Sequence, residues 1–180
     1  MKQRLQEALA SLPENAVVLT ILPNENYEEL NMHMVDLLVN KRKINGAYIT
    51  VNRPYASIIS MMEQNNIDHK KLFFIDCITE KEEQADNCVF MTSPESLTNI
   101  GIALDPIYNS KEHSFVILDS LDALSVYHDH DSIIKFAHSL INRMREHGMS
   151  GIMIGLPEGT DKRILDQLAS FCDTVVDLTD

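Results

Sequence analysis

Histidine and aspartate alternate in the segment Y-H-D-H-D. His128 and His130 could supply nitrogen ligands to a divalent metal, and the neighbouring Asp129 could add a carboxylate oxygen. Residues two apart do not share a helix face, however, and Asp131 or Ser132 could instead cap the helix that is expected to follow. We favour the capping role. We therefore expect no metal and no cofactor in this chain. If a metal does bind, His128 and His130 are the candidate ligands.

The turn after the first apolar run is where an α/β protein would carry a phosphate-binding loop. Such loops use glycine, because the bare backbone must approach the phosphate closely. The stretch T-I-L-P-N-E-N-Y-E-E-L, residues 20–30, has no glycine and three glutamates. A phosphate about 6 Å from one of these carboxylates would meet about 0.7–3 kcal/mol of repulsion per unit-charge pair. The turn is poorly suited to a phosphate.

The same turn has the pattern of an ordinary helix start. Asn26 and Glu29 have the spacing of a capping box, in which the asparagine accepts from an amide of the first turn and the glutamate returns to the cap. Glu28 and Glu29 also favour the positive end of the helix dipole. The pattern predicts that Asn26→Ala costs about 0.5–2 kcal/mol of stability, whereas Glu25→Ala is near neutral.

Nucleophilic catalysis has little support in the sequence. Cys77, Cys88 and Cys172 are odd in number, share no C-x-x-C spacing and lie in or beside apolar runs. They are expected to be reduced and partly buried rather than reactive or zinc-bound. The segment G-L-P-E-G also lacks the serine of a G-x-S-x-G elbow. We name no catalytic residue.

These residues are placed by a regular alternation of strands and helices. Strands that are apolar throughout imply helices on both faces, so the fold class expected is α/β, a three-layer αβα arrangement with a mostly parallel central sheet. The strands are expected at Val17–Ile21, Ala47–Val51, Leu72–Ile75, Cys88–Met91, in the run F-V-I-L-D, and at Gly151–Ile154 and Thr174–Leu178. The helices are expected at Glu25–Val39, Ser57–Asn65, after a cap at Ser93, and at Ile133–Arg145 and Asp161–Phe171.

Composition limits the classes of protein that remain. A chain of 180 residues, 44% of them hydrophobic, is expected to form one domain over residues 1–180. No run approaches the roughly 18 apolar residues of a membrane span, so a cytoplasmic location and no membrane partner are expected. The net charge is −12, which repels a polyanionic backbone, so no nucleic-acid partner is expected either.

The segments F-V-I-L-D-S-L-D-A-L-S-V-Y (115–127), 46–78, 133–155 and 171–178 resemble the KaiC branch of the RecA-type ATPases. The acidic residue that ends an apolar strand in the phrase D-S-L-x-A-L carries most of this resemblance, which covers nearly the whole chain from Val17. It implies a RecA-like P-loop NTPase core. It also implies that Asp119 stands at the Walker B position.

The resemblance fails at the phosphate loop, G-x-x-G-x-G-K-T. Ile21, Asn24 and Asn26 occupy the glycine positions, Tyr27 the lysine position and Glu28 the position of the magnesium-binding hydroxyl. The family's catalytic glutamate after the second strand is also missing, because the local sequence T-V-N-R-P has asparagine and arginine there. The resemblance therefore points to a degenerate member without Walker A.

Three functions follow as hypotheses. The favoured one is a non-catalytic pseudo-ATPase that works as a protein-interaction or regulatory module, either with a partner protein or as a homo-oligomer. The second is a nucleotide-binding sensor without hydrolysis, and the third is a small-molecule enzyme in the cleft at the strand carboxyl ends. Arg53, Tyr55, Met61 and Met62 are candidate partner contacts, with buried packing as their alternative role.

Overall fold

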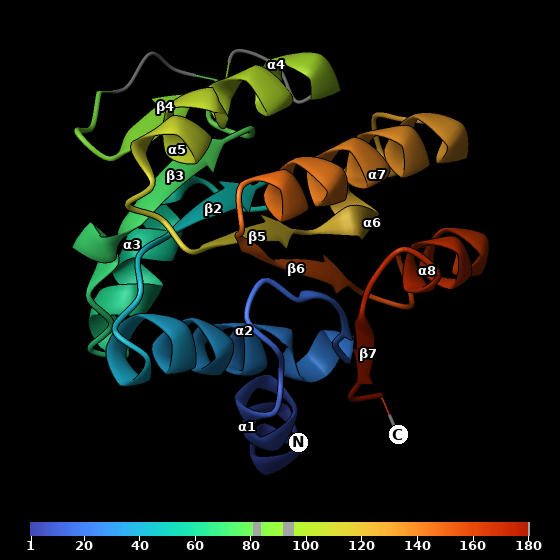
Figure 1. Cartoon of the computed structure of the whole chain (residues 1–180), viewed down its shortest axis with the longest axis horizontal. Helices are drawn as coiled ribbons and strands as arrows, with labels where there is room; N and C mark the ends of the chain where they lie inside the picture. The colour runs from blue at the N-terminus through green and yellow to red at the C-terminus, as the bar shows by residue number, and fades with distance from the viewer. Residues whose placement is uncertain (81–83, 92–95, 180) are drawn as a thin grey trace.

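The central sheet is built from the apolar runs that the sequence predicts as strands (Figure 1). The structure is a computed structural model, and it describes residues 1–80, 84–91 and 96–179. Within these residues seven strands form one sheet in the order β4-β3-β2-β5-β6-β1-β7, and all neighbours are parallel. The strands are β1 Val17–Ile21, β2 Gly46–Thr50, β3 Leu72–Asp76, β4 Cys88–Phe90, β5 Phe115–Asp119, β6 Ser150–Gly155 and β7 Thr174–Asp177.

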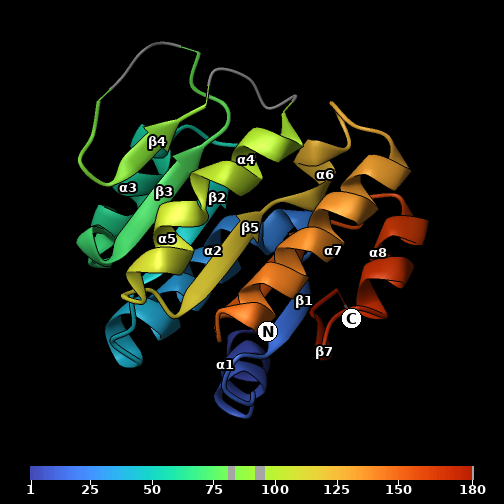
Figure 2. The ribbon, with the colours of Figure 1, turned by 45° about the horizontal axis from the view of Figure 1, so that its top comes forward.

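Helices cover both faces of the sheet (Figure 2). Helices α1, α2 and α3 pack on one face, and α4 to α8 pack on the other. The helices are α1 Lys2–Ala10, α2 Tyr27–Asp36, α3 Tyr55–Gln64, α4 Leu97–Ala103, α5 Asp105–Ser110, α6 Leu121–Leu124, α7 His130–Glu146 and α8 Lys162–Ala169, with helical turns η1 Asn24–Asn26, η2 Leu37–Lys41 and η3 His69–Lys71. The two cores that result bury the strands on both sides.

The predicted α/β class, with three layers and a mostly parallel sheet, is confirmed. Three helices are additions to the prediction, namely α1, α5 and α6. Helices α5 and α6 are only six and four residues long, which is too short for a 3.6-residue period to show in the sequence. Helix α1 buries just Leu5 and Leu9, so its apolar stripe is narrow.

The observed caps differ by a few residues from those expected. Helix α7 begins after Asp129, whose side chain accepts a hydrogen bond from the Ser132 amide at 2.8 Å, so the prediction of Asp131 or Ser132 as the cap is wrong. Helix α4 begins after Ser96, whose side chain accepts from the backbone of its first turn. The predicted cap at Ser93 lies outside the described residues.

The capping box predicted at Asn26 and Glu29 is not formed. Asn26 precedes α2, but its side chain makes no capping hydrogen bond. The reason is the preceding turn η1, which leaves Asn26 at φ −113° and ψ 7° rather than in the extended conformation of a capping residue. Glu29 instead forms an ion pair with Lys2 at 2.7 Å, which links α2 to α1.

The structure therefore predicts that Asn26→Ala changes the free energy of unfolding by less than about 0.5 kcal/mol. Asp129→Ala is the matched positive control, because that side chain does cap a helix and should cost about 0.5–2 kcal/mol. Urea unfolding followed by circular dichroism measures both. A loss of about 1 kcal/mol or more for Asn26→Ala would restore the capping-box interpretation.

Helix length and polarity also bear on membrane insertion. Across residues 1–80, 84–91 and 96–179, no helix is both long enough and apolar enough to cross a bilayer.

Candidate functional site

Polar side chains gather where β2, β3 and β5 end, at the carboxyl edge of the sheet. Thr50, the last residue of β2, pairs in register with Asp119 on one side and with Asp76 on the other. All three are fully buried. They face α1 to α3, because Tyr48 packs on that face and every second strand residue points the same way. Parallel α/β sheets commonly bind ligands at this edge, so it is the candidate site.

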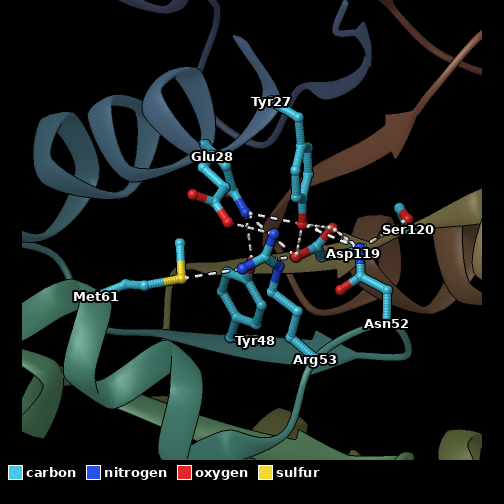
Figure 3. A network of polar contacts seen from close by, with 9 residues as sticks. Tyr27, Glu28, Tyr48, Asn52, Arg53, Met61, Asp119 and Ser120 are labelled. Atoms are coloured by element: carbon cyan, nitrogen blue, oxygen red, sulfur yellow. Dashed lines mark hydrogen bonds and ion pairs between the residues drawn. The ribbon is translucent and has the colours of Figure 1, made fainter. Parts of the chain in front are cut away.

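Asp119 lies at the centre of a buried hydrogen-bond network (Figure 3). The hydroxyl of Tyr27, the first residue of α2, lies 2.5 Å from both carboxylate oxygens, so that its single proton is shared between them. The Tyr48 hydroxyl donates to Oδ2, as does the Asn31 amide at 3.2 Å. Asn31 also donates to the hydroxyl oxygen of Tyr48 at 2.7 Å. Helix α2 and strand β2 thus direct three donors at one carboxylate.

Asn52 extends the network from the loop after β2. Its Nδ2 donates to the Tyr27 hydroxyl oxygen at 3.1 Å and to Ser120 Oγ at 3.3 Å, and it lies 3.5 Å from Asp119 Oδ1. Both oxygens of the carboxylate are therefore surrounded by donors from the chain itself. The peptide bond between Asp119 and Ser120 is cis.

Burial determines the protonation of these groups. It raises the pKa of Asp119 from 3.8 to about 6, and the hydrogen bonds from Tyr27 and Tyr48 oppose that rise. Burial, followed by the Asp119 carboxylate, raises the pKa of both tyrosines above the ordinary value. The two hydroxyls therefore stay protonated at neutral pH and act as donors to the carboxylate. The network is suited to holding α2 against the sheet.

The raised pKa of Asp119 has a consequence for stability. In the window between about pH 4 and pH 6 the folded protein binds more protons at Asp119 than the unfolded chain does. The stability of the wild-type protein relative to Asp119→Asn should therefore fall as the pH rises through this window. Urea unfolding of both proteins at several pH values between about 4 and 7 measures the difference. A wild-type stability that rises with pH relative to Asp119→Asn would contradict the raised pKa of Asp119.

Arg53 covers the network from outside (Figure 3). Its guanidinium forms an ion pair with Glu28 and lies 5.8 Å from the centroid of the Tyr27 ring. Its Nη1 also lies 3.6 Å from the sulfur of Met61. The side chains of Arg53 and Glu28 are 34% and 57% exposed, so solvent weakens their attraction. The pair shields the Tyr27 ring rather than contributing much stability of its own.

The structure separates the residues that the sequence resemblance aligns with a phosphate loop. Tyr27 reaches Asp119, and Glu28 turns outward to Arg53. The side chain of Asn24 donates to Glu158 Oε2 at 2.9 Å, which links the turn after β1 to the loop after β6. Of the residues singled out in this turn, Tyr27 is thus the one that the structure brings to Asp119.

Asp76 organises the neighbouring end of β3. Its carboxylate accepts hydrogen bonds from the amides of Tyr55, Ile78 and Thr79 at 2.7, 2.8 and 2.9 Å, and from the Thr79 hydroxyl at 2.5 Å. It thereby fixes the start of α3 and the turn after β3. A buried carboxylate that is this fully occupied by backbone donors has a structural role.

Sequence reasoning missed several members of this edge. Tyr48 is in the middle of an apolar strand, where an aromatic residue is expected as core packing. Asn31 follows Tyr27 by one helical turn, and this spacing is the signal that could have placed both side chains on one face. Asp76 directly follows the predicted strand Leu72–Ile75 and ends the observed β3, and it could have been recognised by that position.

The histidine candidates for a metal site are not brought together with further ligands. Within the described ranges no three His, Cys, Asp or Glu side chains are arranged to hold a metal ion. His130 Nδ1 lies 3.1 Å from Asp131 Oδ1 at the first turn of α7. The segment thus forms the start of a helix.

The cysteines lie apart from the Asp119 network. Cys77 and Cys88 are buried on opposite faces of the sheet, and Cys172 is partly buried. Burial raises the pKa of the Cys77 thiol to about 12 and that of Cys172 to about 11. These two thiols are therefore protonated at neutral pH, which does not favour nucleophilic attack.

The expected partner contacts have different environments. Met62 is fully buried, so a contact role for Met62 is wrong and its packing role holds. Tyr55 is partly buried and packs edge-on against Phe74, with ring centroids 5.1 Å apart. Arg53 and Met61 remain partly exposed at the rim of the network.

A model of a family of unknown function, DUF7504, matches residues 62–178. The structure is similar to the crystal structure of a KaiC-like protein, PH0186, from the hyperthermophilic archaeon Pyrococcus horikoshii OT3. The TM-score is 0.66 at 12% identity, over 92% of this chain and 73% of the other, which shows a KaiC-like fold and no more. A search of curated proteins finds no match.

Proposed function

We propose that this chain, which belongs to the DUF7504 family of unknown function, is a non-catalytic RecA/KaiC-like module that acts by binding another protein chain. One observation carries the proposal. The carboxylate at the Walker B position, Asp119, is engaged by Tyr27, Tyr48, Asn31 and Asn52 rather than left open to a ligand.

A carboxylate engaged in this way is poorly suited to coordinate a magnesium ion. Mg²⁺ needs near-octahedral oxygen ligands at about 2.0–2.1 Å and usually keeps several waters. Asp119 is completely buried, and the Tyr27 hydroxyl contacts both of its oxygens. Metal binding would have to break these hydrogen bonds and displace the Tyr27 side chain, which α2 holds in place.

The residues after β1 are also poorly suited to binding the phosphates of a nucleotide. A P-loop supplies a lysine and bare backbone amides, whereas Tyr27 stands at the lysine position and Asn24 and Asn26 at two glycine positions. Glu28 and Glu29 add two carboxylates at the start of α2. Their negative charges, although paired with Arg53 and Lys2, lie where a phosphate would otherwise meet the positive end of the helix.

We therefore expect no ATP or GTP turnover by the purified protein. Restoring one residue should not create activity, because Tyr27→Lys leaves Glu28 and the missing glycines in place. A coupled phosphate-release assay on the wild type and on Tyr27→Lys measures this. Turnover that persists through purification and disappears in Asp119→Ala would contradict a pseudo-ATPase.

The binding role itself needs a partner, either a second protein or further copies of this chain. Light scattering on the purified protein reports self-association, and affinity capture from the native cell with mass spectrometry identifies other partners. We expect an oligomer or a reproducible complex. A strictly monomeric protein for which affinity capture recovers no partner would contradict the protein-binding role. That result would favour an enzyme with its site at the carboxyl ends of the strands.

A further inference from the structure

A groove runs between α4 and α7 on the sheet face opposite the Asp119 side chain. These two helices lie side by side in the layer formed by α4 to α8 (Figure 2). The groove has a volume of about 500 Å³, within the range of ligand-binding clefts. The described residues that line its walls belong to α4 and α7, from Leu97 to Ile102 and from Ser132 to Arg143.

The floor of the groove is apolar. Phe136 and Leu140 of α7 form its base with 9% and 3% exposure, and Leu97 is partly buried at one end. Ile102 projects from α4 with 57% of its surface exposed and extends the apolar lining to the rim of the groove. These residues offer an apolar strip between two helices, which is the geometry that accepts an amphipathic helix.

The charge of the groove is opposite to that of the whole chain. Among the described residues its lining contains Lys135 and Arg143 and no acidic side chain, although the protein carries 27 acidic against 15 basic residues. The charge of Arg143 is partly neutralised by its ion pair with Asp105. Lys135 forms no ion pair with any described residue. An acidic helix is therefore attracted here and repelled by most of the remaining surface, which would favour this one docking site.

The groove is also preformed. Arg143 donates to the carbonyl oxygen of Gly101 at 2.9 Å, pairs with Asp105 and lies 4.5 Å from the centroid of the Tyr108 ring. These contacts fix α4 and α5 against α7. Gly101 faces open space, because a Cβ atom built there has no neighbour within 4 Å. A partner would thus bind without first having to separate the two helices.

We propose that the groove between α4 and α7 docks an acidic amphipathic helix of a partner protein, with apolar residues on Phe136 and Leu140 and a carboxylate at Lys135. This deepens the proposed binding function and rests on it. Helix α4 has seven residues and spans about 10 Å, so the contact is expected to cover about two turns of the partner helix.

The test uses the full chain and a defined probe. The probe is a fluorescein-labelled peptide of about 14 residues, with leucines at i, i+3, i+4 and i+7 and glutamates on the other positions. A second peptide with glutamines in place of the glutamates isolates the charge. Fluorescence anisotropy gives the affinities, and thermal unfolding confirms that each variant is folded.

We expect the glutamate peptide to bind with Kd below about 1 mM and about threefold or more tighter than the glutamine peptide. Gly101→Trp fills the groove and should weaken binding about tenfold. Lys135→Glu should remove the preference for the glutamate peptide. Lys162→Glu, an equal change of charge on the exposed surface of α8, should leave binding unchanged.

No binding of the glutamate peptide, or equal binding by Gly101→Trp, would overturn the proposal. A dimer in light scattering that dissociates in Gly101→Trp would assign the groove to a second copy instead, and would also overturn it. These results are distinguishable from failure of the proposed function. Nucleotide turnover would refute the pseudo-ATPase, and it would leave the peptide data on the other face unchanged.

Discussion

Replacement of Asp119 by alanine should lower the free energy of unfolding by about 3 kcal/mol at neutral pH. The substitution leaves the hydroxyls of Tyr27 and Tyr48 and the amide of Asn31 without their common acceptor, in a place that water does not reach. It also leaves a cavity under α2. Urea unfolding followed by circular dichroism measures the loss.

Two variants control this measurement. Asp119→Asn keeps the volume and one acceptor oxygen, so it should cost less than Asp119→Ala. Asp166→Ala removes an exposed carboxylate of α8 and should change stability by less than about 0.5 kcal/mol. A carboxylate kept for a ligand commonly costs stability, so unchanged or increased stability in Asp119→Ala would contradict a structural role.

Asp76→Ala is the second substitution with a large expected effect, about 2–4 kcal/mol. It removes the acceptor of three backbone amides, those of Tyr55, Ile78 and Thr79, which no longer have a protein partner in a partly buried setting. Hydrogen exchange should locate the damage, because these three amides should exchange faster than they do in the wild-type protein, while the amides within the sheet change little.

Asp68→Ala provides the comparison for Asp76→Ala. Asp68 is exposed and accepts one hydrogen bond, from the Lys70 amide at 3.2 Å, in a helical turn close to β3. It should cost well under 1 kcal/mol, about the value of one exposed capping bond. Similar losses for the two aspartates would show that the bonds to Asp76 are not what fixes the start of α3.

The sheet was predictable because its strands are apolar on both faces. The run Val17–Ile21, for example, coincides with β1. In a parallel sheet covered on both faces, apolar and polar residues do not alternate along a strand, so a continuous apolar run marks it. Helix starts were less predictable. At Asn26 the residue types and spacing of a capping box are present, but the preceding turn η1 determines the backbone angles, and sequence spacing does not report them.

The candidate site was predictable in its positions and not in its contacts. The resemblance singled out Asp119 and Tyr27 from the sequence, and the structure places the two side chains in contact. Their hydrogen bond depends on how α2 approaches β5, which is a tertiary relation across 92 residues. Tyr48 joins them because β2 and β5 are neighbours in the sheet, an order that alternating strands and helices leave undetermined.

The central claim, that the Asp119 network stands where a nucleotide would bind, is tested most directly by ligand-dependent melting of the wild-type protein. Mg-ATP, GTP, ADP and cyclic dinucleotides are titrated at millimolar concentrations, because any ligand that binds the folded state raises the melting temperature. We predict no shift with any of them. A dose-dependent rise with one nucleotide, absent in Asp119→Asn, would show that the site still binds its ligand.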